Sequence, residues 1–306
     1  MKSRRYLMYD VFTDAPLAGN PLAIVLDGEN LDSEQMQRIA VEFNLSETVF
    51  LTAPQNPVHT KRVRIFTPRH ELPFAGHPTV GTAIALAELA RTGEQDDHSA
   101  LIMLEEEIGP VRCAVSFSAT DVFGEFDLPR LPSKLPVDIL PESMAAALGL
   151  APHEIGFENH TVSIWSAGVP FVCVPVANLD ASARAMVDER LWQELVPDVN
   201  GIRPNAYVYC RETVNHDSAF HARMFAQGLG IAEDPATGSA AAAFAGAIVE
   251  SDLPMDGTHR CWIEQGIEMG RPSRIRLEVE VEGGEIRGAR IGGGAIKVAE
   301  GTLFIG

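Results

Sequence analysis

The sequence predicts an α+β protein built from two similar lobes related by a pseudo-twofold axis, with one apolar helix inside each lobe. Three observations predict this fold class. The same succession of patterns occurs once in each half of the chain, each half contains an alanine-rich helical segment, and short strand-like segments surround both helices. The 306 residues are also enough for two lobes that each bury an apolar core.

The internal duplication is visible as short matching segments in the same order in both halves. Residues 18–21 read AGNP and residues 167–170 read AGVP, an offset of 149 positions (167 minus 18). Further along the chain the offset is 159 positions, which corresponds to one insertion of ten residues (159 minus 149). At this second offset TVF at 48–50 matches YVY at 207–209, and RIF at 64–66 matches RMF at 223–225.

Each half contains a helix that should be enclosed. Residues 83–89 and 240–249 are alanine-rich, and each segment follows a turn rich in Gly and Pro. A helix that is small or apolar on every side is normally buried all round, so each of these helices should run through the middle of its lobe.

Strands and two outer helices should surround the central helices. An amphipathic helix over residues 33–43, capped by Asp32 or Ser33, should cover the outside of the first lobe, and residues 183–196 should form its counterpart. Strand-like patterns occur at residues 6–12, 22–26, 48–52, 63–66, 101–104 and 111–117, and again at 161–165, 171–174, 261–264 and 275–281.

The proline-spaced stretch 128–137 is the expected linker, so that one lobe spans residues 1–130 and the other residues 131–306. The pattern leaves open which lobe the last strand, residues 301–305, joins. Three glycines at 292–294 lead into a strand-like segment rather than a helix, which favours a turn or bulge over a nucleotide-binding loop.

Composition excludes several classes of partner. Lys and Arg number 24 against 42 Asp and Glu, so the formal net charge at pH 7 is -18 and the long-range field repels nucleic acids and anionic membrane surfaces. The most apolar stretch, residues 240–249, is too short to span a bilayer, and Asp10 interrupts the first apolar run. We therefore expect a cytoplasmic protein whose partner is a small molecule, without contact to nucleic acid or membrane.

The four cysteines do not indicate a metal site or a disulfide framework. Cys113, Cys173, Cys210 and Cys261 are widely separated and form no C-x-x-C pair. We expect them to be small buried hydrophobic residues, with a reactive thiol as the open alternative.

The starts of the two enclosed helices are the candidate binding sites. A helix start offers unpaired N–H groups and a partial positive charge, so it binds anions without Lys or Arg. Gly76 and Gly238 let a ligand approach the backbone closely, while Thr79 and Ser239 add hydroxyl donors. Gly and Pro also simply shape turns, but their occurrence at both helix starts favours a ligand site in a cleft between the lobes.

Polar residues that the duplication does not repeat are the candidates for chemistry. Glu47 opens an apolar strand, and at the offset of 159 its counterpart is Ala206. Each candidate also has a structural interpretation: Glu47 as a solvated strand edge, Asp234 as a helix cap, and His77 as a residue that closes a turn.

Short motifs across nearly the whole chain resemble those of one known family. They are VFT at 11–13, AGNP at 18–21, NLSET at 44–48, FTP at 66–68, ELPFAGHPT at 71–79, EDPATGSA at 233–240, QG at 265–266 and GRPS at 270–273. In these motifs the sequence resembles the PhzF-like phenazine-biosynthesis isomerase family, which shares the two-lobed diaminopimelate epimerase fold. The resemblance implies that each lobe is a strongly curved, mostly antiparallel sheet wrapped around its central helix.

The resemblance also implies roles for individual residues. Glu47 is then the catalytic acid/base, His77 and Asp234 contact polar groups of the substrate, and Gly238 and Ser239 bind its carboxylate, with Gly76 at the other helix start. It implies no cofactor and no metal, and it suggests a homodimer. The related epimerases place a cysteine at each helix start, whereas this chain has Ala75, Gly76 and Pro235 there. Racemisation by two thiols is therefore disfavoured.

The functional hypothesis is a cofactor-independent isomerase. Glu47 would move a proton on a small cyclic or unsaturated amino or hydroxy acid whose carboxylate lies on the second helix start. The first alternative is a protein that binds a small anion, or acts as a scaffold, without turnover. The second is a metal-dependent hydrolase using His70, Glu71 and His77, although their spacing matches no zinc helix motif.

Overall fold

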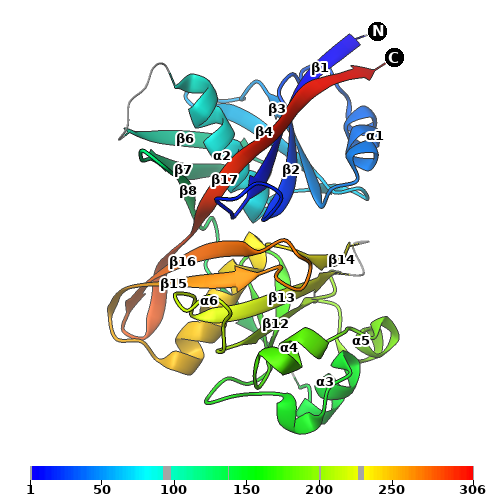
Figure 1. Cartoon of the computed structure of the whole chain (residues 1–306), viewed down its shortest axis with the longest axis vertical. Helices are drawn as coiled ribbons and strands as arrows, with labels where there is room; N and C mark the ends of the chain where they lie inside the picture. Colours follow the sequence, from blue (N-terminus) through cyan, green and yellow to red (C-terminus); the bar gives the residue numbers. More distant parts are fainter. Residues whose placement is uncertain (1, 92–97, 137, 200, 227–230, 306) are drawn as a thin grey trace. The chain divides into compact units, whose positions relative to one another are not determined.

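The computed structural model divides the chain into two compact units. Unit 1 comprises Met1–Pro129 and Gly292–Gly306, and unit 2 comprises Arg130–Ile291. The expected linker, residues 128–137, spans the start of unit 2, and its last residue, Val137, lies outside the described residues. The structure describes residues 2–91, 98–136, 138–199, 201–226 and 231–305 (Figure 1).

Unit 1 is a sheet that closes on itself. Its strand order is β17–β1–β2–β3–β4–β6–β7–β8, and β8 pairs with β17 to complete the circle. The β2–β3 and β4–β6 pairs are parallel, and β1 pairs antiparallel with both of its neighbours. The strands are β1 (Lys2–Val11), β2 (Asn20–Val25), β3 (Glu47–Thr52), β4 (Lys61–Phe66), β5 (Glu71–Leu72), β6 (His98–Glu106), β7 (Gly109–Phe117), β8 (Val122–Asp127) and β17 (Glu285–Ile305). The residues of β17 up to Ile291 belong to unit 2.

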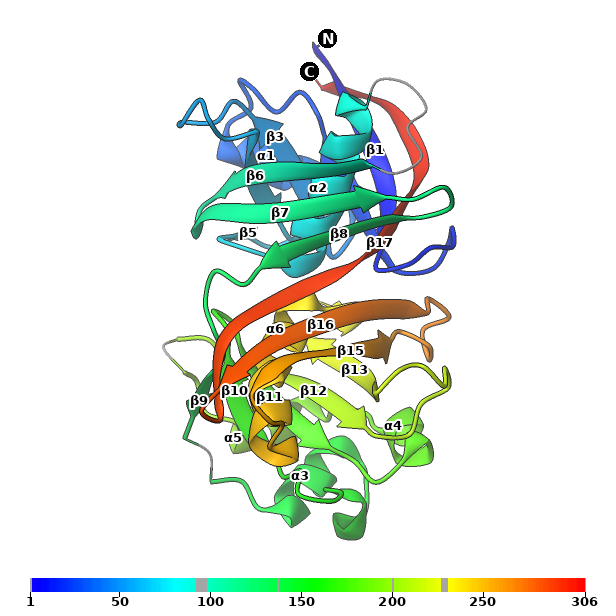
Figure 2. The same cartoon turned by 90° about the vertical axis from the view of Figure 1, so that its left-hand side faces the viewer.

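Helix α2 (Gly76–Ala90) lies inside this sheet and packs against β1, β2, β3, β6, β7 and β8. Figure 2 shows β6, β7 and β8 side by side across it. Small residues permit the fit: a Cβ on Gly81 would lie 2.7 Å from Val11 Cγ2, and one on Gly124 would lie 2.9 Å from Ile84 Cγ1. The predicted enclosure of this helix is confirmed, because every residue from Gly76 to Ala85 is buried.

Helix α1 (Ser33–Phe43) covers the outside of unit 1, as predicted. Asp32 is the N-cap, and its Oδ1 accepts a hydrogen bond of 2.8 Å from Gln35 N. The Gln35 side chain in turn accepts from the Asp32 backbone N–H, which completes a capping box. The buried face of the helix, which includes Met36 and Ile39, packs on the apolar cluster around Phe50.

Unit 2 repeats the arrangement of unit 1. Its strand order is β9–β10–β11–β12–β13–β15–β16, with the parallel pairs β11–β12 and β13–β15 in the places of β2–β3 and β4–β6. Helix α6 (Gly238–Asp252) is buried from Ala240 to Val249 and packs against β9, β10, β11 and β16, which confirms the second enclosed helix. The strands are β9 (Ser133–Leu135), β10 (Ser163–Ser166), β11 (Pro170–Pro175), β12 (Asn205–Cys210), β13 (Phe220–Ala226), β14 (Ile231–Asp234), β15 (Gly257–Gln265) and β16 (Ser273–Glu282).

The strand register corrects the counterpart of Glu47. Leu22 pairs with Glu47 in unit 1, and Phe171, which lies 149 positions after Leu22 (171 minus 22), pairs with Asn205 in unit 2. Asn205, not Ala206, therefore occupies the matching position. The prediction was wrong by one residue because the similar letters TVF and YVY aligned the strands out of register, and a slip of one residue places a side chain on the opposite face.

The predicted helix over residues 183–196 is wrong, because the structure has two short helices instead. Helix α4 (Leu179–Arg184) ends where the Arg223 guanidinium donates to the carbonyls of Ser182 and Ala185, at 2.7 and 3.0 Å. Asp188 then caps α5 (Glu189–Leu195) by accepting a hydrogen bond of 2.9 Å from Leu191 N. Unit 2 also contains α3 (Pro141–Leu148) and a 3₁₀ turn at Pro152–Glu154.

The glycines at 292–294 lie inside the long strand β17, so they do not form the expected turn. Their function is close packing: a Cβ on Gly292 would lie 2.7 Å from Phe123 Cζ, and one on Gly294 would lie 2.8 Å from Thr13 O. The register of the β1–β17 pair shifts elsewhere, between Met8 and Tyr9. The last residues of β17 pair with β1, where Lys2 lies opposite Ile305.

The four cysteines are free thiols. Cys113, Cys173 and Cys210 are buried, as expected of small hydrophobic residues, and Cys261 is partly buried. Burial raises the pKa of the Cys113 and Cys173 thiols, which keeps them in the unreactive thiol form at neutral pH.

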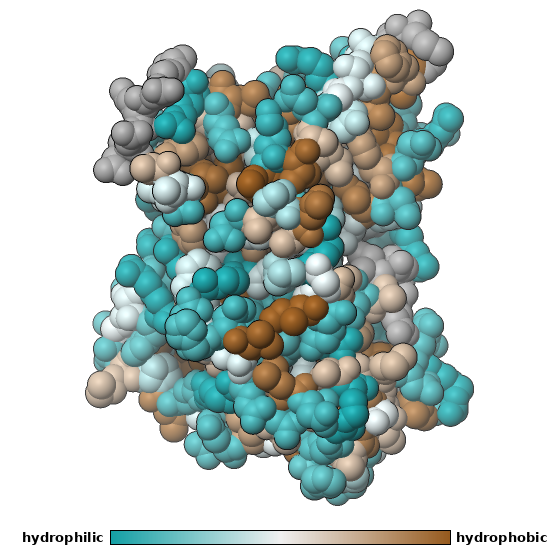
Figure 3. Space-filling view, viewed as in Figure 1, coloured by the Kyte–Doolittle hydropathy of each residue, from teal (hydrophilic) through white to brown (hydrophobic). Residues whose placement is uncertain are grey.

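Hydrophilic residues cover much of the face drawn in Figure 3. Among the described residues, no helix combines the length and the apolar character that crossing a membrane requires.

Gly246 tests the packing of the enclosed helix in unit 2. A Cβ at this position would lie 2.1 Å from Trp165 Cε3, and the Trp165 indole is held by a hydrogen bond of 3.2 Å to Ser163 Oγ. We expect Gly246→Ala to lower the free energy of unfolding by about 1–3 kcal/mol, because overpacking outweighs the gain in helix propensity. Chemical denaturation measures the change. Gly288→Ala is the control, since its Cβ would meet only the Glu280 side chain, with the flexible carboxylate oxygen at 3.3 Å and Cβ at 3.8 Å. Equal stability of the two variants would show that Trp165 does not restrict position 246.

Candidate active site

The candidate site in unit 1 begins with two polar residues at the starts of neighbouring parallel strands. Asn20 is the first residue of β2 and is fully buried, and Glu47 is the first residue of β3. The Glu47 side chain is 14% exposed, so its carboxyl group lies close to the surface of the fold without being freely solvated. The strand therefore fixes the backbone position of Glu47, the residue whose carboxyl group is predicted to be catalytic.

His77 lies between these residues and the start of α2. It is the second residue of the helix, and its ring is buried with 4% of the side chain exposed. Nδ1 lies 3.3 Å from Asn20 Nδ2 and 3.4 Å from Glu47 Oε2. The structure thus brings Glu47, His77 and Gly76 together at one helix start, with Asn20 as a fourth member.

The His77 ring is neutral. Burial lowers its pKa to about 3, against a smaller opposite effect of the Pro21 carbonyl. The approach of Glu47 Oε2 to Nδ1 is therefore not an ion pair, although the distance alone would allow one. It is a contact between a carboxyl oxygen and an uncharged ring, which fits its length of 3.4 Å.

Asn20 meets His77 at one of the two ring nitrogens. Asn20 Nδ2 lies 3.3 Å from Nδ1, and the tautomer of the ring sets which of the two atoms donates. The other ring nitrogen, Nε2, is buried and has no hydrogen-bond partner within the described part of the chain. A buried polar atom without a partner is costly, so Nε2 is available to a polar group of a ligand.

The start of α2 has no side-chain cap. Its N-cap residue is Ala75, which has no polar side chain, and Pro78 in the first turn has no N–H. The amides of Gly76 and His77 are therefore the donors at this helix start, in a position that favours negative charge.

The candidate residues of unit 2 lie around the start of α6. Asp234 is the last residue of β14 and is buried, and its Oδ2 accepts a hydrogen bond of 2.6 Å from Thr237 Oγ1. Thr237, not Asp234, is the N-cap residue, and it makes no side-chain capping bond. Gly238 and Ser239 follow as the first two residues of the helix, with Gly238 buried and Ser239 partly buried.

The buried side chain of Gln265 holds the segment Asp234–Thr237, which precedes this helix, in place. Gln265, at the end of β15, donates from Nε2 to Asp234 O at 2.7 Å and accepts at Oε1 from Thr237 N at 3.2 Å. The next residue, Gly266, has φ +75°, and a Cβ there would lie 2.6 Å from Pro235 O. Only glycine fits this left-handed conformation against the Asp234–Thr237 turn.

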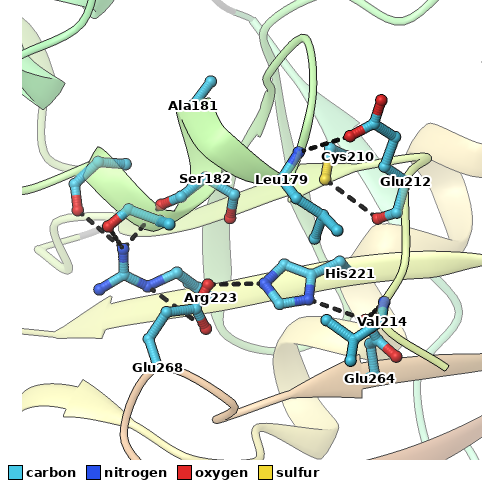
Figure 4. A network of polar contacts seen from close by, with 12 residues as sticks. Leu179, Ala181, Ser182, Cys210, Glu212, Val214, His221, Arg223, Glu264 and Glu268 are labelled. Carbon is cyan, nitrogen blue, oxygen red and sulfur yellow. Dashed lines mark hydrogen bonds and ion pairs between the residues drawn. The ribbon is translucent and has the colours of Figure 1, made fainter.

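An ion-pair network supports the strand that ends in Asp234. Arg223 on β13 makes two hydrogen bonds of 2.8 and 2.9 Å to Glu233, the neighbour of Asp234. His221 on the same strand lies 2.9 Å from both Glu264 and Glu268 (Figure 4). The two carboxylates outweigh burial and raise the pKa of His221 to about 9, so the ring is a cation at neutral pH.

Metal ligation finds little support in the side chains. Ligand atoms of Glu158, His160 and Asp252 lie within 4.8 Å of one another, but Arg211 donates to both carboxylates and already supplies the compensating charge. His70, Glu71 and His77 do not form the metal site that the hydrolase alternative requires. His70 is exposed, and Arg64 donates to both carboxylate oxygens of Glu71 at 2.7 and 2.6 Å.

The sequence missed three residues that contact the candidate groups. Asn20 and Gln265 lie in the motifs AGNP and QG, but no sequence pattern marks them, or Glu106, as contacts of the candidate groups. The available signal was a polar residue at one end of a strand, the first residue for Asn20 and the last for Glu106 and Gln265. Sequence alone does not show that the side chain is buried.

A sequence profile described as "phenazine biosynthesis-like protein" matches residues 9–301. The chain belongs to this family. Among its relatives, the chain is 62% identical over 306 residues to an uncharacterized isomerase of Mesorhizobium japonicum, and the match covers 100% of both chains. It is 33% identical to the trans-2,3-dihydro-3-hydroxyanthranilate isomerase of Pseudomonas aeruginosa, covering 98% of this chain and 99% of the relative.

A solved structure supports the same family membership. The phenazine biosynthesis protein of the PhzF family from Bacillus anthracis matches with a TM-score of 0.88 at 28% identity, and the match covers 100% of both chains. The PhzF-like resemblance predicted from the motifs is therefore confirmed, and the names of the relatives support an isomerase.

The neutral state of His77 in this PhzF-family protein predicts a pH dependence of stability. The unfolded chain binds a proton below pH 6.5, whereas the folded protein does not do so until about pH 3. Folding stability is therefore full above the unfolded pKa and falls as the pH decreases through this window. In His77→Asn, the free energy of unfolding should fall less steeply between pH 6.5 and 4, by up to about 1.4 kcal/mol per pH unit.

Denaturant titrations at several pH values measure this slope. The exposed His216, changed to Asn, is the matched control and should follow the wild type. Parallel curves for the wild type and His77→Asn would show that His77 is protonated equally in the folded and unfolded states, and would refute the neutral ring.

Proposed function

We propose that this protein is a cofactor-independent isomerase that moves a proton on a small carboxylate-bearing substrate, with Glu47 as the acid/base. The observation that carries the proposal is the position of the Glu47 carboxyl group. Its Oε2 lies 3.4 Å from a buried neutral imidazole, at the uncapped start of an enclosed helix. Membership of a family whose relatives are named isomerases supports the same reaction class.

The start of α6 would bind the carboxylate of the substrate. Gly238 is buried at the first position of the helix, and the Ser239 hydroxyl adds a side-chain donor. Asp234, fixed by Thr237 and Gln265, would accept from an amino or hydroxyl group. The proposal requires that one substrate is held by residues of both units.

The chemistry would be a balanced proton transfer. Glu47 takes a proton from an acidic C–H of the substrate, and the electron pair of that bond enters the adjacent unsaturated system. The same carboxyl group returns the proton to a second carbon, or to oxygen, so that no electrons are gained or lost. With its proton on Nε2, the ring nitrogen that has no partner in the described structure, His77 would donate a hydrogen bond to a substrate oxygen and stabilise the charge that develops there.

The ring of His77 suits this role because it is neutral. A pKa of about 3 means that the ring stays uncharged throughout the physiological range and acts as a hydrogen-bond donor rather than as a competing acid. Only one group near the reacting carbon, Glu47, would then exchange protons.

The substrate class follows from the donors and acceptors. An anion-binding helix start, an acceptor at Asp234 and a donor at His77 together fit a cyclic or unsaturated amino or hydroxy acid. Trans-2,3-dihydro-3-hydroxyanthranilate, named for the Pseudomonas relatives, is a member of that class and is the first compound to test.

Turnover in deuterated water tests the role of Glu47. We expect the wild type to incorporate deuterium into the product, and Glu47→Gln to lose about 10²- to 10⁴-fold in kcat while still binding the substrate. Glu42→Gln, at an exposed position on α1, is the matched control and should keep wild-type turnover. NMR of the product measures both rate and label.

Two results would contradict the proposal. Undiminished turnover and labelling by Glu47→Gln would remove Glu47 from the reaction. Tight binding of the compound by the wild type, with no product and no exchange across a panel of small cyclic carboxylates, would favour the non-catalytic binding protein instead.

A further inference from the structure

The last residues of β6 and β15 occupy matching positions in the two units. In unit 1, Arg62 pairs with Glu105, and in unit 2, His221 pairs with Glu264. Each residue of the second pair lies 159 positions after its counterpart in the first pair (221 minus 62, 264 minus 105). The next residues are Glu106 and Gln265, and each ends its strand. The carboxyl group of Glu106 in unit 1 therefore occupies the place of the Gln265 amide in unit 2.

In unit 2 the amide begins a chain of hydrogen bonds that ends at the candidate site. Gln265 Nε2 donates to Thr237 Oγ1 at 3.1 Å, and Thr237 Oγ1 donates to Asp234 Oδ2 at 2.6 Å. The hydrogen bonds therefore run from Gln265 at the strand end, through the Thr237 hydroxyl, to the Asp234 carboxylate beside the helix start. The chain requires a donor at position 265, which the amide always supplies.

Unit 1 contains a chain of the same kind. Thr79 Oγ1 lies 2.8 Å from Glu106 Oε1 and 2.7 Å from the carbonyl oxygen of Ala75, the N-cap residue of α2. A hydroxyl group has one hydrogen, so it cannot donate to both oxygens. If Glu106 carries a proton, both contacts are satisfied: Glu106 donates to Thr79, and Thr79 donates to Ala75.

The surroundings of Glu106 favour this protonated form. The residue is 5% exposed, its Oε2 has no hydrogen-bond partner in the described structure, and no cation among those residues pairs with it. The polar group that faces it from α2 is the Thr79 hydroxyl, and the buried titratable group of β7 is the Cys113 thiol, itself held in the uncharged form by burial. Arg112, the cation of β7, is exposed and donates to Asp127. A carboxylate at this place would be a buried charge without compensation.

We propose that Glu106 is a positioning residue of the candidate site and that it acts as an uncharged hydrogen-bond donor, in the manner of Gln265 in unit 2. Through Thr79 it fixes the Ala75 carbonyl, and with it the first turn of α2 that carries Gly76 and His77. Loss of its proton would take the Thr79 hydrogen away from Ala75 and loosen the helix start. The inference that this changes turnover rests on the proposed function, whereas the protonation of Glu106 does not.

The expected pH range is alkaline. Burial raises the pKa of Glu106 to about 8, against a smaller opposite effect of the Thr79 hydrogen bond. Because the folded protein keeps the proton that the unfolded chain loses near pH 4.5, the stability contributed by the protonated state falls as the pH rises from 4.5 to about 8.

Three variants test the proposal: Glu106→Leu removes the donor, Glu106→Gln restores it without a titrating group, and Gln265→Glu introduces a titrating group into unit 2. We expect Glu106→Leu to raise KM or lower kcat at least tenfold at pH 7, and Glu106→Gln to recover most of that loss. The wild type should lose activity with a midpoint near pH 8, and Glu106→Gln should lack that loss. Gln265→Glu should acquire an additional loss of activity at alkaline pH.

A readout without substrate separates this inference from the proposed function. In ¹³C NMR of glutamate carboxyl groups, one signal that is absent from Glu106→Gln should titrate near pH 8. The melting temperature of Glu106→Gln should exceed that of the wild type by more at pH 8.5 than at pH 5. If this signal titrates near pH 4.5, or if Glu106→Leu retains wild-type kinetics, the proposal is overturned, whatever the outcome for Glu47.

Discussion

The candidate site depends on one physical constraint, the enclosure of a helix start by a curved sheet. The first turn of α2 is buried from Gly76 onward, so its polar neighbours cannot rely on water. Each neighbour must be uncharged or must have a partner. His77 satisfies this condition as a neutral ring, Glu106 satisfies it in the protonated form, and Asp234 satisfies it at the other helix start through the Thr237 hydroxyl.

The duplication explains how one architecture carries two different sets of groups. Glu47 in unit 1 matches Asn205 in unit 2, and Glu106 matches Gln265. At both places unit 1 has a carboxyl group and unit 2 has an amide, and Gln265 has nearly the same shape as Glu106. Proton transfer needs a carboxyl group, whereas steady binding of an anion is better served by groups that never acquire negative charge. The division suits an acid/base function in one unit and carboxylate binding in the other.

The sequence predicted what local patterns determine. The alanine-rich segments identified both enclosed helices, and the cap of α1 was narrowed to Asp32 or Ser33, of which the structure has Asp32. The break within residues 183–196 was not predictable because it depends on Arg223, a residue of a distant strand. The register that pairs Asn205 with Glu47 is a property of strand pairing, not of residue similarity. Glu106 lies in a run of three glutamates at 105–107, which looks solvated until burial distinguishes its middle member.

A crystal structure of Glu47→Gln with a bound cyclic amino or hydroxy acid would decide whether the two helix starts serve one substrate. We expect the ligand carboxylate at the amide of Gly238 and the hydroxyl of Ser239, and a ligand carbon within about 3.5 Å of the residue 47 side chain. The same structure should show His77 Nε2 donating to a ligand oxygen. A ligand bound away from the start of α6, or a residue 47 that cannot reach any ligand carbon, would rule out the proposed proton transfer.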